Sequence, residues 1–289
     1  MEITTPPFRV RYAETDAQGV AYYGSYFAWW EVGEVHFFER LGLDIPDLDR
    51  RGLALTVAES YAKFIRPARY DDLVVVRIRL SQAAPKRFLF ETELVRCHDD
   101  QCLATGRLAD VVLGPSGQVQ PLPERLVAAA EERVERVVAC ERAEEILGHD
   151  TTGEPADTQE LRVRYAETDA QGVAYYASHY VWFEVGRNAL TRAVGMPYTE
   201  IERQGHSLPV AEAYCRYLAP LRPTERFTVT TTSRAIGRAR LAFINRLTRA
   251  DGVPAAEGFT IHGYTDDSGR PRPLPQEILQ RFAPTDIRP

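Results

Sequence analysis

Arg-Val-Arg-Tyr-Ala-Glu-Thr-Asp-Ala-Gln-Gly-Val-Ala-Tyr-Tyr spans Arg9–Tyr23 and returns unchanged as Arg162–Tyr176. Outside this run the two halves agree mainly in hydrophobic pattern, as in Phe27–Gly33 against Tyr180–Gly186. A structural scaffold needs only such a pattern, so complete identity in one segment indicates that this segment has a chemical function. The 289-residue chain is therefore a tandem duplication with a functional segment in each copy.

The composition is typical of a folded globular protein. Hydrophobic residues make up 44% and charged residues 26%, which is enough apolar material for a core. A net charge of −6 argues against a nucleic-acid surface, because such surfaces usually carry a basic stripe. The four cysteines show no close pairing for zinc or redox chemistry, and no apolar run reaches membrane-spanning length. We therefore expect a cytoplasmic protein with reduced thiols, no metal, and no nucleic-acid or membrane partner.

Each copy is predicted to contain a short strand, a loop, a long helix and four further strands. In the first copy Phe8–Tyr12 alternates apolar with charged residues, Thr15–Gly19 carries turn-forming residues, and Ser25–Leu41 is apolar around most of a helix's circumference. Such a helix must be covered by other secondary-structure elements. Consecutive strands with short turns favour a mainly antiparallel sheet in an α+β fold. The expected strands are Leu53–Phe64, Leu73–Gln82, Phe88–Cys97 and Leu103–Leu113, then Leu208–Leu218, Phe227–Ser233, Leu241–Arg249 and Ala255–Tyr264.

The segment between the copies is predicted to be a linker. From Pro123 to about Leu147 it is rich in Ala, Glu and Arg with spaced apolar residues, which indicates an amphipathic helix. His149–Gln159 is polar with Gly153 and Pro155, which is typical of a flexible connector. We expect domains at residues 1–123 and 160–289, separated by this linker helix and connector at 124–159.

The run Tyr12–Tyr23, followed by Ser25–Phe27 and an aromatic-rich helix, resembles the hotdog-fold acyl-CoA thioesterases of the 4-hydroxybenzoyl-CoA thioesterase type. The resemblance covers nearly all of each half and rests on the pattern Thr-Asp-x-x-Gly-x-x-x-Tyr. It implies two tandem hotdog domains, each an antiparallel sheet wrapped around one long central helix. It also implies that the two domains pair as an intrachain pseudo-dimer with active sites at their junction.

The resemblance places the catalytic aspartate at Asp16 and Asp169, and the backbone N–H that polarises the thioester carbonyl at Tyr23 and Tyr176. A thioester has an electrophilic carbonyl and a good leaving group, so its hydrolysis needs one base or nucleophile and one polarising donor. No cofactor is expected, since coenzyme A is part of the substrate. The sequence leaves open whether the aspartate activates water or attacks the carbonyl. Because both copies keep both positions, we expect two working sites.

Other residues shared by the copies are secondary candidates. Gln18 and Gln171 either orient water or the acyl carbonyl, or are exposed loop residues. Glu31 and Glu184 lie within a mostly apolar helix, where an ionised carboxylate without a partner is costly. We prefer a structural hydrogen-bonding role for them over an auxiliary base. The candidates for binding the CoA phosphates are Arg69, Arg222, Arg87 and Arg240.

Three functions compete. Acyl-CoA hydrolysis is the first, and hydrolysis of acyl groups on acyl carrier protein, or a hotdog dehydratase, is the second. Dehydratases of this fold use a catalytic histidine, but none of the six histidines recurs at an equivalent position in the two copies. A non-catalytic acyl-CoA sensor is the third, and it would have little reason to retain both Asp16 and Asp169. The acyl group stays open, and we expect a dimer of chains because the family commonly stacks pairs into larger oligomers.

Overall fold

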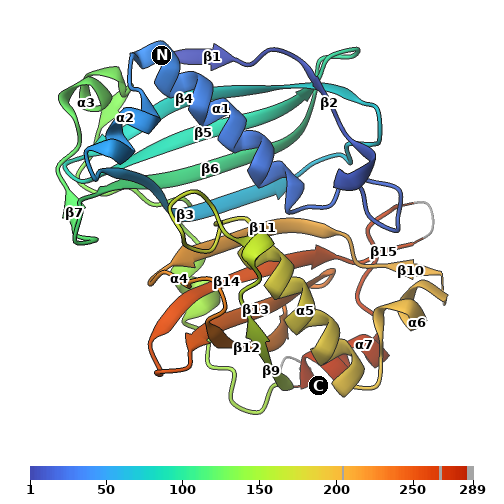
Figure 1. The fold of residues 1–289 in the computed structure, drawn as a ribbon. Helices are drawn as coiled ribbons and strands as arrows, with labels where there is room; N and C mark the ends of the chain where they lie inside the picture. Colours follow the sequence, from blue (N-terminus) through green and yellow to red (C-terminus); the bar gives the residue numbers. More distant parts are fainter. Residues whose placement is uncertain (204, 267–268, 285–289) are drawn as a thin grey trace. The chain divides into compact units, whose positions relative to one another are not determined.

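The computed structural model describes residues 1–203, 205–266 and 269–284, and the chain divides into two compact units, Met1–Glu141 and Arg142–Pro289. Each unit combines one long helix with an antiparallel sheet (Figure 1). Among the described residues, no helix is both long enough and apolar enough to cross a membrane.

The main sheet of the first unit has the strand order β1, β4, β5, β6, β3. Neighbouring strands in this order are antiparallel, β2 and β8 add to β4, and β7 adds to β6. The elements are β1 (Glu2–Thr4), β2 (Phe8–Arg9), η1 (Tyr12–Glu14), α1 (Ser25–Leu41), α2 (Ile45–Arg50), β3 (Ala54–Phe64), β4 (Leu73–Ala84), β5 (Arg87–Arg96), β6 (Gln101–Leu113), β7 (Val119–Gln120), α3 (Glu124–Ala129) and β8 (Glu132–Arg133).

The second unit repeats this order as β9, β12, β13, β14, β11, and β10 pairs with β15 in a separate ribbon. The elements are α4 (Ala143–Leu147), β9 (Ala156–Arg162), η2 (Tyr165–Glu167), α5 (Ser178–Ala193), α6 (Tyr198–Arg203), β10 (His206–Ser207), β11 (Val210–Tyr217), β12 (Arg226–Ala235), β13 (Arg240–Arg249), β14 (Pro254–Gly263), β15 (Thr265–Asp266) and α7 (Gln276–Phe282).

Helix α1 has the predicted bounds and packs against β4 and β5. It ends at Gly42, whose φ of 70° is the left-handed conformation that commonly closes a helix. Gly33 allows a close approach to the sheet, because a Cβ there would lie 2.8 Å from Cγ1 of Val76. The expectation of burial around most of the circumference is wrong for the opposite face, where Val32 and Val35 are 40% and 37% exposed.

The four strands predicted after the helix are present in both units, with ends within a few residues of the predicted ones. The first predicted strand is shorter than expected, since β2 ends at Arg9. Tyr12–Glu14 instead forms a turn of 3₁₀ helix, in which the Glu14 carboxylate accepts a hydrogen bond from the Arg11 N–H at 2.7 Å. A side chain that satisfies the backbone locally competes with strand pairing.

The single linker helix predicted from Pro123 to about Leu147 is wrong. The segment forms α3, then β8, then α4. The N–H of Glu131 donates to the Leu80 carbonyl at 3.1 Å, and that of Val134 donates to Ala83 at 3.0 Å. The open edge of β4 thus offers backbone partners that outweigh the helix propensity of an Ala- and Glu-rich sequence.

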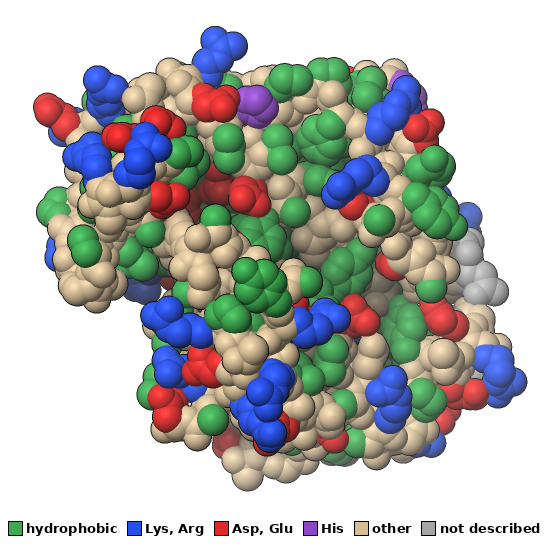
Figure 2. Space-filling model, viewed as in Figure 1, with side chains coloured by type: hydrophobic (Ala, Val, Ile, Leu, Met, Phe, Trp, Pro, Cys, Tyr) green, Lys and Arg blue, Asp and Glu red, His purple; other side chains and the backbone are tan. Residues whose placement is uncertain are grey.

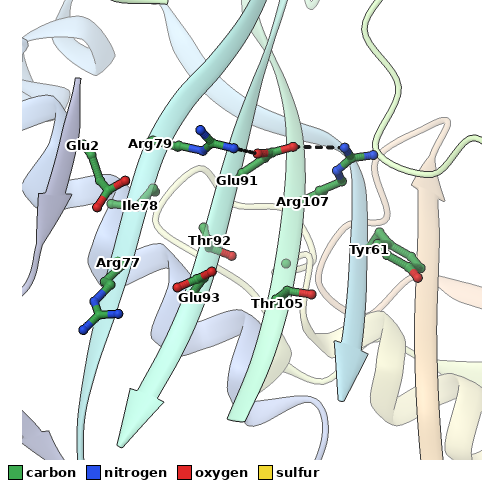
Figure 3. Close-up of a pocket in the computed structure, with 11 residues that line it drawn as sticks. Glu2, Tyr61, Arg77, Ile78, Arg79, Glu91, Thr92, Glu93, Thr105 and Arg107 are labelled. Atoms are coloured by element: carbon green, nitrogen blue, oxygen red, sulfur yellow. Dashed lines mark hydrogen bonds and ion pairs between the residues drawn. The ribbon is translucent and has the colours of Figure 1, made fainter. Parts of the chain in front are cut away.

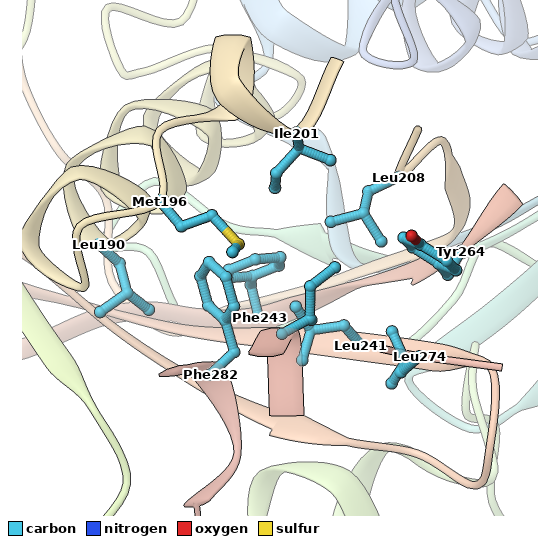
Figure 4. Packing of buried hydrophobic residues seen from close by; sticks show 10 residues of the cluster. Leu190, Met196, Ile201, Leu208, Leu241, Phe243, Tyr264, Leu274 and Phe282 are labelled. Carbon is cyan, nitrogen blue, oxygen red and sulfur yellow. The ribbon is translucent and has the colours of Figure 1, made fainter. Parts of the chain in front are cut away.

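In the second unit, the end of α5 closes over a compact apolar cluster against β13 and α7 (Figure 4). Its members come from helix ends, strands and the C-terminal helix α7. The cluster therefore holds helix α5 against the rest of the unit. The cluster consists of Leu190, Met196, Ile201, Leu208, Leu241, Phe243, Tyr264, Leu274, Ile278 and Phe282.

Candidate active site

The loop that carries Asp16 is closed by its own backbone. The Asp16 N–H donates to the Val20 carbonyl at 2.9 Å, and the Gly19 N–H donates to the Asp16 carbonyl at 3.0 Å. Gly19 has a φ of 72°, which a residue with a Cβ rarely adopts. The second copy repeats the geometry, with Asp169 N–H to Val173 at 3.0 Å. The predicted loop position of the aspartate is therefore confirmed in both units.

Each aspartate side chain is held in an Asx turn. Oδ1 of Asp16 accepts a hydrogen bond from the Gln18 N–H at 2.9 Å, and Oδ1 of Asp169 accepts one from the Gln171 N–H at 2.8 Å. Asp16 is exposed and Asp169 is partly buried. Such a bond can stabilise a turn, and it also orients the carboxylate at the surface of its unit.

Glu14 is a structural residue of the site that the motif pattern alone does not single out. Its Oε1 accepts hydrogen bonds from the Arg11 guanidinium at 2.7 Å and the Trp29 indole at 3.0 Å, while its carbonyl accepts from the Tyr22 N–H at 2.8 Å. Burial alone would raise the pKa of Glu14, but the bonds from Arg11 and Trp29 outweigh it and lower the pKa. Glu14 thus clamps the loop to helix α1, and its place inside the identical run is the signal that could have revealed it.

Glu167 does the same in the second unit. Its Oε1 accepts from the Arg164 guanidinium at 2.7 Å, its carbonyl accepts from the Tyr175 N–H at 2.8 Å, and its pKa is likewise lowered against the effect of burial by Arg164 and Trp182.

The start of the long helix lies directly after the loop. Helix α1 begins at Ser25 behind the cap residue Gly24, as predicted, and α5 begins at Ser178 behind Ala177. The first N–H groups of a helix have no partner within the helix, and its N-terminus carries partial positive charge. Tyr23 and Tyr176 precede this start, so the structure brings a carboxylate loop and a helix N-terminus together in each unit.

Arg69 and Arg222 lie in exposed turns next to the loop. The Ala21 N–H donates to the Ala68 carbonyl at 2.8 Å, and the Ala174 N–H donates to the Leu221 carbonyl at 2.7 Å. Each turn is therefore hydrogen-bonded to the repeated segment through the residue just before its arginine.

Arg87 and Arg240 are engaged elsewhere. Arg87 donates to Oε1 of Glu59 at 2.7 Å, and Arg240 donates to Oε1 of Glu212 at 3.4 Å. Both glutamates are buried and sit at β-bulges of β3 and β11. These arginines offset buried carboxylates, so they fit a structural role better than phosphate binding.

The remaining candidates lie at the surface or near it. Gln18 and Gln171 are exposed, and their contribution in the structure is the backbone N–H of the Asx turn. Glu31 is exposed and Glu184 is partly buried, with its Oε1 accepting a hydrogen bond from Asn188 at 3.2 Å. The premise that Glu31 is a buried helix carboxylate is therefore wrong.

A hollow of about 380 Å³ lies on the outer face of the first unit's sheet, and none of the motif residues lines it (Figure 3). Glu91 stands at its centre between Arg79 and Arg107, with ion pairs of 2.5 and 2.9 Å. Because these charges neutralise one another, the hollow does not offer an anion site. Charges of both signs are also mixed over the face seen in Figure 2.

Comparison with known proteins gives consistent results. The model of the thioesterase-like superfamily matches residues 10–130 and again 163–282. YneP of Bacillus subtilis, a candidate acyl-CoA thioesterase, is 42% identical over 73 residues, which cover 25% of this chain and about half, 53%, of YneP. The acyl-CoA thioesterase YbgC of Haemophilus influenzae is 31% identical over 124 residues, which cover 43% of this chain and 90% of YbgC.

Solved structures match the fold over most of the chain. A candidate oleoyl thioesterase of Lactobacillus plantarum superposes with a TM-score of 0.76 at 18% identity, covering 96% of this chain and 98% of that one. The 12:0-ACP thioesterase of Umbellularia californica superposes with a TM-score of 0.72 at 12% identity, covering 94% of each chain. The twofold match of the superfamily model, over residues 10–130 and 163–282, shows that the chain belongs to the thioesterase-like superfamily.

Proposed function

We propose that the protein hydrolyses acyl-CoA thioesters through two sites, one centred on Asp16 and one on Asp169. The observation that carries the proposal is the repeated loop, in which an Asx turn orients a carboxylate just before the N-terminus of the long helix. The relatives named acyl-CoA thioesterase support the same reaction class.

In the proposed reaction, water adds across the bond between the acyl carbon and sulfur, giving a carboxylic acid and the CoA thiol. The aspartate takes a proton from the attacking water or forms a mixed anhydride that water then opens. The N–H of Tyr23 or Tyr176 donates to the carbonyl oxygen as negative charge develops on it, and the helix macrodipole adds to this stabilisation. Gln18 and Gln171 are placed to orient the carboxylate through their N–H groups, while Glu31 and Glu184 need take no part.

Arg69 and Arg222 are the proposed partners of the CoA phosphates. They are exposed, and each turn is tied by a backbone hydrogen bond to the loop that carries the aspartate. Arg87 and Arg240 are the less suitable pair, because each already neutralises a buried glutamate.

The test is release of free thiol from short, medium, long and aromatic acyl-CoAs by the wild type and by the Asp16→Asn/Asp169→Asn double variant. General acid–base catalysis contributes about 10²- to 10⁴-fold, so turnover should fall by at least about 100-fold in the double variant. Circular dichroism must show an unchanged fold. Full turnover in the folded double variant would refute the Asp-centred mechanism.

A second candidate function is hydrolysis of acyl-acyl carrier protein. It is favoured by a relative of that name, ATL3 of Arabidopsis thaliana, which is 29% identical over 126 residues. Parallel assays with the same acyl group on CoA and on acyl carrier protein distinguish the two, because the preferred carrier gives the higher kcat/KM. No turnover on either carrier would favour a non-catalytic acyl-CoA sensor.

For assembly, the resemblance supports two hotdog domains that wrap their long helices and pair within one chain as a pseudo-dimer. We further propose that two chains associate and that the protein works in the cytoplasm. Sedimentation of the full chain tests the dimer, and a single species at 32.6 kDa would refute it.

A further inference from the structure

The peptide that begins helix α5 is held by two side chains in the second unit. The Tyr176 carbonyl accepts a hydrogen bond from the Tyr217 hydroxyl at 3.2 Å and one from Nδ1 of His179 at 3.1 Å. The His179 backbone N–H also lies 3.3 Å from the same oxygen. Tyr176 supplies the proposed polarising N–H, so these bonds fix the residue whose donor direction matters.

His179 is a neutral donor in this arrangement. A carbonyl can only accept, so the proton of the imidazole must lie on Nδ1. The side chain is 4% exposed, and burial lowers its pKa to about 4. The rings of Trp182 and Tyr217 pack on it with centroid distances of 4.7 and 4.9 Å, which restricts its rotation.

The first copy lacks both donors. With the sequence offset of 153, Tyr217 corresponds to Phe64 and His179 corresponds to Tyr26. Phe64 has no hydroxyl group. The Tyr26 hydroxyl is directed to the neighbouring turn, where it accepts a hydrogen bond from the Ala68 N–H at 3.0 Å, and burial raises its pKa to about 12. The loops of the two copies are identical in sequence, but the residues that correspond to Tyr217 and His179 are not.

We propose that Tyr217 and His179 are positioning residues of the second site, and that this site has the higher kcat of the two. The inference rests on the proposed function. Donors that are already oriented cost no reorganisation when charge develops in the transition state. Tyr217 and His179 act through the Tyr176 carbonyl, which lies in the peptide after the donor N–H, and not on the ground-state substrate, so they affect kcat and leave KM nearly unchanged.

The experiment isolates each site with a single aspartate change. In the Asp16→Asn chain only the second site works, and Tyr217→Phe or His179→Phe should each lower kcat by about 3- to 10-fold, the value of one net hydrogen bond. KM should stay within about twofold. His179→Asn places an amide N–H near the position of Nδ1, so it should retain most of the activity that His179→Phe loses.

The chain supplies its own control. In the Asp169→Asn background only the first site works, and Tyr217→Phe should leave its kcat unchanged. In that background Phe64→Tyr, which inserts the residue of the second copy, tests whether the hydroxyl alone raises kcat at the first site. Melting temperatures within a few degrees of the parent show that each variant is folded.

A kcat of the second site that is unchanged by Tyr217→Phe, or a loss of activity that His179→Asn fails to restore, overturns the inference. A first site that is faster than the second overturns it as well. If neither single aspartate change nor the double change lowers turnover, the proposed function fails instead, and this outcome is distinct.

Discussion

Glu34 on α1 and Asp110 on β6 form a side-chain hydrogen bond between two acidic groups inside the first unit, where they are 7% and 3% exposed. Burial raises the pKa of Asp110 to about 7, and burial together with the nearby Asp110 raises the pKa of Glu34 well above its usual range. A hydrogen bond between two carboxyl groups needs a proton on one of them, so the pair retains a proton in the folded state. The corresponding residues of the second copy are Arg187 and His262.

The first prediction concerns the pH dependence of the first unit. Folding raises the pKa of these groups, so between about pH 4 and pH 7 the folded state holds a proton that the unfolded chain has released. Stability of this unit should therefore fall as pH rises through that window, by up to about 1.4 kcal/mol per pH unit for one proton. Asp110→Asn should flatten the slope. Pulsed hydrogen exchange during urea unfolding measures the stability of each unit separately. Asp100→Asn, at an exposed position, is the control and should keep the parental slope of stability against pH.

The second unit should respond in the opposite direction. Burial, and for His262 also the nearby Arg187, lowers the pKa of His262 to about 3, and burial lowers that of His179 to about 4. The unfolded chain binds protons on these histidines below about pH 6.5 while the folded unit does not, so stability falls as pH falls from about 6.5 to 4. The same exchange measurement checks this. Parallel pH profiles for the two units would contradict both predictions.

Glu14→Gln should loosen the loop of the first site. The change removes the charge that pairs with Arg11 at 2.7 Å and weakens a partly buried clamp, which costs about 1–3 kcal/mol. In the Asp169→Asn background we expect turnover to fall by about tenfold. Glu31→Gln on the exposed face of α1 is the matched control and should leave turnover unchanged. A comparable loss with Glu31→Gln would instead restore Glu31 as an auxiliary base.

Gly33→Ala and Gly186→Ala should destabilise their units by about 1–3 kcal/mol through overpacking. A Cβ at Gly33 would meet Cγ1 of Val76 at 2.8 Å, and one at Gly186 would overlap Oγ1 of Thr231. Gly263→Ala is the control, because a Cβ there meets no atom within 4 Å. Urea denaturation with unit-resolved hydrogen exchange gives the three free energies. Equal losses of unfolding free energy in all three variants would mean that the close approach of helix to sheet does not restrict side chains at Gly33 and Gly186.

Arg69→Ala and Arg87→Ala should have different consequences. Arg69 is exposed beside the loop, so its removal should raise KM for acyl-CoA several-fold with little change in the free energy of unfolding. Arg87→Ala leaves buried Glu59 without its 2.7 Å partner, and breaking such a pair costs about 3 kcal/mol. KM values and urea midpoints separate the two effects. A raised KM for a stable Arg87→Ala protein would return Arg87 to the phosphate-binding candidates.

Several elements of the fold were predictable because local pattern and tertiary environment agree in them. Ser25–Leu41 carries more than four turns of apolar residues and ends at Gly42, and the strands following it alternate strongly enough to fix their faces. The Asx-turn geometry at Asp16 follows from Asp and Gly three residues apart. These features depend on neighbours along the chain.

The errors arose where contacts distant in sequence decided the outcome. The segment after Pro123 has helical composition, but Glu132–Arg133 pairs with the free edge of β4 and forms a strand. Helical periodicity does not show which acid faces the sheet: the shared position points to Glu31, whereas Glu34 is the buried acid. Arg87 and Arg69 both recur in the second copy, and only the position of Glu59 on a neighbouring element distinguishes them.

The sequence by itself determined the duplication, the loop with Asp16 and Asp169, the long helix after it and the superfamily, because these depend on residues close together in the chain. Only the tertiary structure decided which residues lie behind the identical loops. Tyr217 and His179 hold the helix start in one unit, whereas Phe64 and Tyr26 occupy the same places in the other. Side-chain partners on separate elements meet only when helix and sheet pack, so no local pattern encodes them.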